Sequence, residues 1–213
     1  MPLPFYNEFM LTAERSWTMA DSKRNLKKEG TRKKIISAAF KTYSESSFAA
    51  PTIMIAKEAG VAHGSMFLHF PTRDDLLSCL AEEFGSILSA RFCELSGTYD
   101  TIEELLGAHI DILSEYESFY SRLITESAYL PGRARAAVAK LQSGLEYHFN
   151  IVLNTGIESG SLKKLPPRIL FGAWLGLVHY YLQNNDLQAS GDSILKRYKR
   201  QLIFTYCELL RRQ

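Results

Sequence analysis

The chain has 213 residues, of which 46% are hydrophobic and 23% charged, and its formal net charge at pH 7 is +2. These values exclude a disordered chain, a collagen-like chain and a disulfide scaffold. Three scattered cysteines, Cys79, Cys93 and Cys207, fit a reducing cytoplasm, and the most apolar run, Ile169–Leu182, is too short to span a membrane. We therefore expect a cytoplasmic protein without a membrane partner.

The charge is distributed unevenly along the chain. Residues 21–73 carry ten Lys and Arg against four Asp and Glu, whereas the other residues carry 15 against 19. A basic N-terminal third followed by a mildly acidic remainder favours a module that faces an anion, joined to a second module. A solvated basic face without a partner is the alternative.

The N-terminal 34 residues show no clean helical period. Residues 1–22 contain Pro2 and Pro4 and are expected to form an irregular extension, in which Met19 is an alternative start of the protein. Residues 23–34 are expected to form a basic arm. Beyond them, apolar residues at helical spacing and breakers between them predict helices over about 35–46, 51–60, 63–70, 73–97, 101–115, 117–129, 133–159, 167–184 and 193–211. The sequence thus predicts an all-α fold of about nine helices.

The second and third predicted helices meet at a glycine. The small Ala56 lets the two helices cross closely, Gly60 permits a tight turn, and Val61 fills the angle between them. This arrangement is typical of a helix-turn-helix, in which the first helix braces and the second enters the major groove of DNA.

A longer pattern makes this interpretation more specific. The chain reads I-I-S-A-A from Ile35, I-A-K-E-A-G-V from Ile55, G-S-M-F-L-H-F-P from Gly64 and R-D-D-L-L from Arg73. Over residues 32–77 it resembles the N-terminal domain of the tetracycline-repressor (TetR) family of bacterial transcription regulators. After the irregular extension over 1–22, the resemblance implies a three-helix helix-turn-helix domain over 23–75 and a helical effector-binding and dimerisation domain over 76–213.

The resemblance also implies the residues that contact DNA. Thr52 and Thr72 begin helices, where hydroxyl and backbone N–H groups can meet phosphate. The side chains that open the recognition helix come within reach of base edges. The basic arm either follows the DNA or is disordered without it. The full expected set is Lys33, Thr52, His63, Gly64, Ser65, Phe67, Leu68, His69, Thr72 and Arg73.

Alternatives are open for several of these residues, and the chain departs from the family pattern at several positions. His69 and Phe67 could be packing residues, and Thr72 could be only a helix cap. The stretch from Phe48 to Ile55 is one residue shorter than usual, and Pro51 stands where the family often has a capping Thr. Ala62 replaces the usual Ser or Thr cap of the recognition helix, a loss on the order of 1 kcal/mol. Phe67 replaces a tyrosine whose hydroxyl commonly reaches a phosphate, and Arg73 replaces a lysine.

No catalytic or metal-binding motif stands out. The five histidines make no zinc spacing, and neither a phosphate-binding loop nor a G-x-S-x-G nucleophile is present. Two S-x-x-K matches fit chance occurrence. We therefore expect neither an enzyme nor a cofactor.

The second domain is rich in aromatic residues, which form either its core or a pocket for an apolar small molecule. The pocket candidates are Phe84, His109, Tyr116, Tyr120, Tyr147, His148 and Trp174. The last two helices carry apolar stripes that family members pair with a second copy, the alternative being an ordinary core. The dimer candidates are Gly172, Trp174, Leu177, Val178, Tyr181, Tyr198, Leu202, Tyr206 and Leu209.

The combined prediction is a homodimeric regulator, a repressor released from a near-palindromic DNA operator by a small-molecule effector. Three alternatives stay open at this point. They are a ligand-independent or architectural DNA-binding protein, an enzyme with a vestigial helix-turn-helix, and a module that sequesters another protein.

Overall fold

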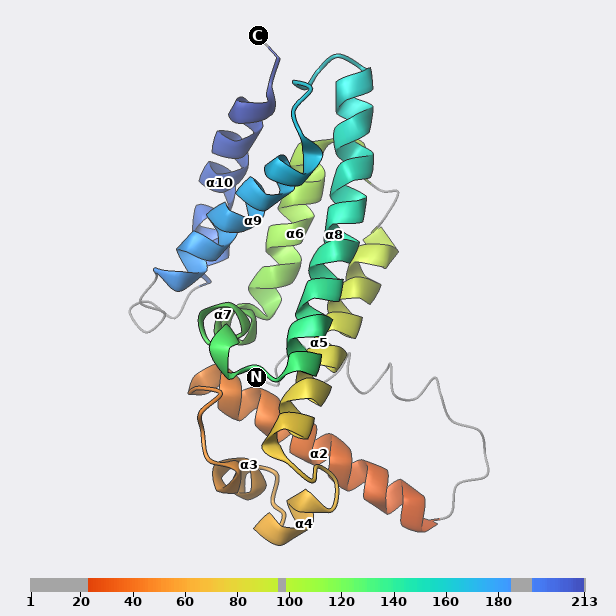
Figure 1. Cartoon of the computed structure of the whole chain (residues 1–213), viewed down its shortest axis with the longest axis vertical. Coiled ribbons are helices and arrows are strands. Elements are labelled where there is room, and N and C mark those ends of the chain that lie inside the picture. The colour runs from red at the N-terminus through yellow and green to blue at the C-terminus, as the bar shows by residue number, and fades with distance from the viewer. Residues whose placement is uncertain (1–22, 96–98, 185–192, 213) are drawn as a thin grey trace. The chain divides into compact units, whose positions relative to one another are not determined.

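The computed structural model describes residues 23–95, 99–184 and 193–212, so the expectations for residues 1–22 lie outside the described residues. Within these ranges the chain is helical, and the all-α prediction is confirmed (Figure 1). The helices are α2 (Lys23–Glu45), α3 (Thr52–Glu58), α4 (His63–Phe67), α5 (Arg73–Leu95), α6 (Ile102–Glu115), α7 (Glu117–Thr125), α8 (Gly132–Glu158), α9 (Pro167–Gln183) and α10 (Ile194–Leu210), with a 3-10 turn η1 (Ser127–Tyr129). None of them combines the length and apolar character that crossing a membrane requires.

The basic arm is part of a helix. Residues 23–34 continue without a break into the helix predicted from Ile35 onward, so α2 is a single helix. Lysine, arginine and leucine are good helix formers, which explains why the arm is helical. Its side chains from Asn25 to Lys28 are exposed, so the segment has no apolar stripe for periodicity to detect.

Tertiary contacts divide the chain into two units. The first consists of the described residues up to Ile87 together with Glu126–Val138, and the second of Leu88–Thr125 with the described residues from Ala139 onward. Two helices, α5 and α8, therefore contribute residues to both units.

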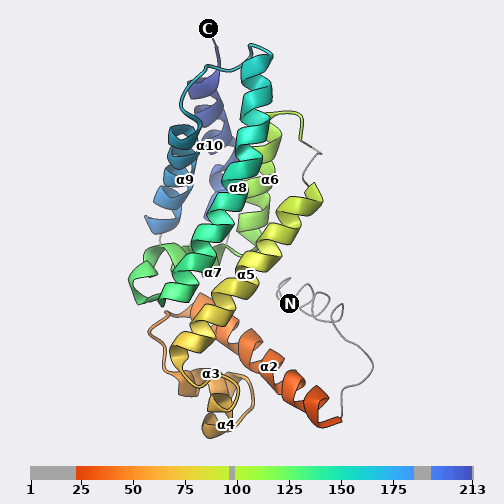
Figure 2. The same ribbon diagram turned by 45° about the vertical axis from the view of Figure 1, so that its right-hand side comes forward.

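The first unit is built around α2, α3 and α4. Helix α2 packs against α3, and α3 against α4 (Figures 1 and 2). The residues at its centre are fully buried, and they include Ile35, Tyr43, Phe48, Ile55, Met66 and Leu76.

The segment between α7 and α8 also belongs to the first unit. Its Glu126 carboxylate accepts hydrogen bonds from the Ser47 hydroxyl and the Phe48 backbone N–H, both at 2.7 Å. Leu130 of this segment is buried, and so is Ala134 in the first turn of α8. These contacts attach a segment from the middle of the sequence to the turn that follows α2.

The second unit packs α10 against both α6 and α9, and α7 against α9. An aromatic cluster lies inside it, with the rings of Trp174 and Tyr206 5.2 Å apart and those of Phe149 and Phe171 5.6 Å apart. The N-terminus of α10 is held by the buried carboxylate of Glu117, which accepts hydrogen bonds from the backbone N–H groups of residues 194 and 195 and from the Ser193 hydroxyl.

Candidate DNA-binding and effector sites

Helices α3 and α4 form the predicted helix-turn-helix. Gly60 has a φ of +66°, the left-handed conformation that favours glycine, and it lies in the turn between the helices. The Val61 N–H bonds to the Ala56 carbonyl at 3.0 Å, and Ala56 is buried where the helices approach. Met66 anchors α4 in the core with no exposed surface. Helix α4 therefore buries the face that carries Met66 and leaves the opposite face exposed.

The start of α4 is fixed by a contact with α3. The His63 Nε2 lies 2.9 Å from the Thr52 hydroxyl, and the His63 ring meets Phe67 edge-on at 5.1 Å. Thr52 and His63, both predicted DNA contacts, are thus joined. Gly64 is exposed with open space around it, and Ser65 is half-buried.

Two apolar residues lie on the free face of α4. Leu68 is 78% exposed and Phe67 38% exposed, whereas Phe70 is buried. His69 is half-buried, and burial together with the nearby Lys28 and Arg32 lowers the pKa of its imidazole. Because the Phe67 side chain is exposed, it is not a core residue in this structure, contrary to the packing alternative raised for it.

Thr72 caps α5. Its hydroxyl donates to the Asp75 carboxylate at 2.7 Å and accepts the Asp75 backbone N–H at 3.0 Å. Arg73 follows, with two guanidinium nitrogens buried. Burial raises the pKa of the Tyr43 phenol, and the nearby Arg73 opposes that shift. Arg73 is therefore directed in part toward the core, while Lys33 is half-buried on α2.

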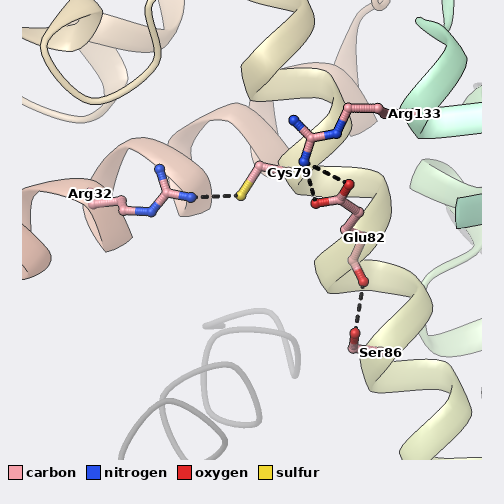
Figure 3. Close-up of polar contacts among 5 residues, drawn as sticks. All are labelled: Arg32, Cys79, Glu82, Ser86 and Arg133. Carbon is pink, nitrogen blue, oxygen red and sulfur yellow. Dashed lines mark hydrogen bonds and ion pairs between the residues drawn. The ribbon is translucent and has the colours of Figure 1, made fainter. Parts of the chain in front are cut away.

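Sequence reasoning missed Arg32. Figure 3 shows this α2 residue reaching Cys79 on α5, at 3.1 Å from the sulfur. Its guanidinium also lies 4.3 Å from the centre of the Phe70 ring and donates to the His69 carbonyl at 3.4 Å. Burial raises the pKa of Cys79 to about 11, so it is a neutral thiol at neutral pH. A basic residue within a basic arm gave no signal of this bracing role.

A second set of contacts joins α8 to α5. Arg133 pairs with Glu82 at 2.9 Å, one turn beyond Cys79 (Figure 3). Because both side chains are substantially exposed, this pair contributes little to stability by itself.

Several of the predicted effector residues form a buried polar group in the second unit. The Trp174 indole N–H donates to His109 Nδ1 at 2.8 Å, and the Tyr120 hydroxyl lies 2.8 Å from His179 Nε2. Burial lowers the pKa of His109 to about 3 and that of His179 to about 4, so both imidazoles are neutral. Burial also raises the pKa of the Tyr120 phenol, whereas its hydrogen bond with Gln142 lowers that pKa. His179 was not among the predicted effector residues, because it lies within an apolar run that indicates a buried helix.

The other effector candidates differ in burial and in the unit to which they belong. Tyr116 is buried, Phe84 is buried in the first unit, Tyr147 is 65% exposed and His148 is half-buried. A cavity of about 380 Å³ lies elsewhere in the second unit, and its lining includes Ile102, Gly156, Ser161, Leu162 and Arg211. None of the predicted effector residues lines that cavity.

Four of the dimer candidates need correction. Trp174, Val178, Leu202 and Tyr206 are at most 2% exposed within their own unit, so they cannot meet a second copy while the unit keeps this fold. Helix α9 is apolar on nearly all sides, and periodicity could not tell which side faces inward.

A different face of α9 is free. Its exposed residues include Ile169, Gly172, Ala173, Gly176 and Tyr180. Among the other dimer candidates, Leu209 is exposed, and Leu177, Tyr181 and Tyr198 are half-buried. Within the described residues, no group of three or more histidine, cysteine or carboxylate side chains could hold a metal ion.

Comparison with known proteins agrees with this arrangement. Residues 35–79 match the model of the family "Bacterial regulatory proteins, tetR family", and residues 97–183 match that of the "Tetracyclin repressor-like, C-terminal domain". The two models together cover more than half of the chain. The "Fatty acid metabolism regulator protein" of Bacillus subtilis (strain 168) is 26% identical over 178 residues, which are 76% of this chain and 90% of that protein.

Solved structures show the same fold. The transcriptional regulator FadR from Bacillus subtilis, crystallised with stearoyl-CoA, matches with a TM-score of 0.66 and 20% identity over 82% of this chain and 96% of that one. A transcriptional regulator from Saccharomonospora viridis, crystallised with choline, matches with a TM-score of 0.72 and 16% identity over 87% of this chain and 100% of that one. The chain therefore belongs to the TetR family of bacterial transcription regulators, which bind operator DNA, dimerise and respond to small-molecule effectors.

Proposed function

We propose that this protein is a homodimeric repressor that binds a near-palindromic operator and leaves it when a small molecule binds. Helix α4 of each copy enters the major groove, and the two recognition helices lie about one helical turn, roughly 34 Å, apart. The observation that carries this proposal is the α3–α4 pair, anchored by Met66 and turned at Gly60 so that the other face of α4 is free. Because its target is genomic DNA, the protein acts in the cytoplasm, on the nucleoid.

The DNA-contacting residues divide by role in this proposal. His63, Gly64, Ser65, Phe67 and Leu68 face the bases from the free side of α4. The other candidates, Lys33, Thr52, His69, Thr72 and Arg73, act at the phosphates or hold the helices that do. Because two guanidinium nitrogens of Arg73 are buried, we expect Arg73 to contribute less to phosphate binding than its sequence position suggests.

The effector that we propose is a fatty acyl-CoA thioester. Support comes from the Bacillus subtilis relative, a fatty acid metabolism regulator, and from the stearoyl-CoA in the FadR structure. The polar pairs His109–Trp174 and Tyr120–His179, set among apolar side chains, are groups that could orient such a ligand.

Two features support a route from effector to DNA. Helices α5 and α8 contribute to both units, and Glu126 ties the segment before α8 to the turn after α2. An effector that binds better when this segment is displaced shifts the population away from the DNA-binding state, by no more than its difference in affinity for the two states.

The test of DNA binding is selection of fragments from the source genome with the purified full chain at two salt concentrations. We expect one near-palindromic sequence, bound more weakly at high salt because phosphate contacts release counterions. Binding without sequence preference would instead support the architectural alternative.

A further inference from the structure

The free face of α4 is poor in hydrogen-bonding groups and rich in apolar surface. From Ala62 to Leu68, His63 and Ser65 are the only polar side chains, and Ser65 is half-buried. Nothing on this face resembles the Arg, Lys, Asn or Gln side chains that read guanine and adenine with paired hydrogen bonds.

His63 has little freedom to change this. One ring nitrogen is engaged with the Thr52 hydroxyl at 2.9 Å, and the ring packs edge-on against Phe67 at 5.1 Å. Only Nδ1 is left for a base. His63 can therefore form at most one hydrogen bond with a base. Its edge-on contact with Phe67 orients the Phe67 ring.

Leu68 is the most exposed large apolar residue among those described in the first unit, at 78%. It is the C-cap of α4, where its N–H bonds to the carbonyl of Ser65. Its neighbours Met66 and Phe70 fill the core, so the turn of the chain between them directs Leu68 outward. Internal packing therefore does not account for a leucine at this position.

The major groove offers an apolar side chain one apolar partner, the 5-methyl group of thymine. We infer that Leu68, with Phe67 beside it, is a specificity-determining residue that recognises a thymine methyl group in each operator half-site. This inference rests on the proposed function. The excess of lysine and arginine over residues 21–73 supplies the attraction to phosphate, which carries no sequence information, so base discrimination depends on the free face of α4, where Leu68 is the most exposed large apolar side chain.

The experiment removes single methyl groups from the DNA. In the selected operator, each thymine is replaced in turn by deoxyuridine, symmetrically in both half-sites, and binding to the full chain is measured by fluorescence anisotropy. For the wild-type protein we expect at least one position at which losing the methyl group weakens binding by about three- to tenfold.

Protein variants identify the side chain responsible. Leu68→Ala should weaken binding to the thymine operator and abolish the difference between thymine and deoxyuridine at that position. Ile53→Ala is the matched control, because Ile53 is 57% exposed on α3, the helix that crosses the backbone. Ile53→Ala should change the affinity for the thymine operator and for the deoxyuridine operator by the same factor. Because both residues are exposed, melting temperatures should stay close to that of the wild type.

The outcomes separate this inference from the proposed function. Equal affinity for all deoxyuridine operators, or a Leu68→Ala protein that keeps the full methyl effect, would overturn the inference and leave the operator intact. Failure to select any preferred sequence would overturn both, because no base would then be read.

Discussion

His109 and His179 are neutral imidazoles held within the second unit. The hydrogen bond from Trp174 fixes His109 with its proton on Nε2, because Nδ1 is the acceptor. Protonation of His109 would put two donors against each other and place a charge in an apolar core. Both effects favour the neutral form.

The stability of the fold should therefore depend on pH. With folded pKa values of about 3 and about 4, the two histidines bind protons only in the unfolded state as the pH falls below about 6.5. The free energy of unfolding should decrease from pH 7 to pH 5, by about 2 kcal/mol through His109 alone. Urea denaturation at both pH values measures this change.

His109→Gln isolates this contribution, since a glutamine oxygen can still accept the Trp174 N–H and does not titrate. Its loss of stability between the two pH values should be smaller than that of the wild type. His148→Gln, at a half-buried position, is the control and should follow the wild type. An identical pH dependence in the His109 variant would show that this imidazole is not held neutral.

For single residues, the sequence was a better guide to the types of side chain involved than to their positions in the fold. His109, Trp174 and Tyr120 were expected to line an effector pocket, and in the structure they form hydrogen bonds inside the second unit. Tyr147 and His148 carry the same chemistry but lie outside the core. The direction of a side chain depends on packing by residues distant in sequence, which periodicity does not contain.

Helix boundaries are set by local chemistry, and most of them could be predicted. Thr101 begins α6 with a reciprocal capping arrangement involving Glu104, and Thr72 begins α5 in the same manner with Asp75. The start of α2 was not predicted, because an exposed helix has no apolar period. The inward face of α9 was not predicted either, because nearly all of its faces are apolar.

The N-terminus of α10 depends on a residue from another helix. Replacing Glu117 by alanine would leave the Ile194 and Leu195 N–H groups buried without their acceptor, so we expect a loss of about 2–4 kcal/mol in the free energy of unfolding. Urea denaturation checks this value. Glu158→Ala at the exposed end of α8 is the control and should change it by less than about 0.5 kcal/mol. Equal effects of the two substitutions would contradict the capping role.

For the whole molecule, dimerisation is needed to place two recognition helices on one operator. The free face of α9 contains Gly172 and Gly176, where a second copy could approach closely. The sequence indicated two apolar helices for this role, but only the structure shows which of their faces are available.

Gly176→Glu tests that face. No atom lies within 4 Å of the added Cβ, and glutamate favours helix more than glycine by up to about 1 kcal/mol, so each copy should stay folded. A buried, unpaired charge should prevent pairing, and light scattering after size-exclusion chromatography should give a monomer with weakened operator binding. Gly144→Glu on α8, which also has open space, should remain dimeric. A Gly176→Glu protein that still dimerises would place the interface elsewhere.

The central claim is that sequence-specific DNA binding is controlled by a small molecule. The most direct measurement is titration of the selected operator with the full chain, with and without stearoyl-CoA, together with a scrambled fragment of equal length. We predict tight binding of the operator alone, weak binding of the scrambled fragment, and a fall in operator affinity of at least tenfold when the acyl-CoA is present. Under conditions in which the protein is folded and dimeric, two results would contradict the account: equal affinity for the operator and the scrambled fragment, or an operator affinity that the proposed effector stearoyl-CoA leaves unchanged.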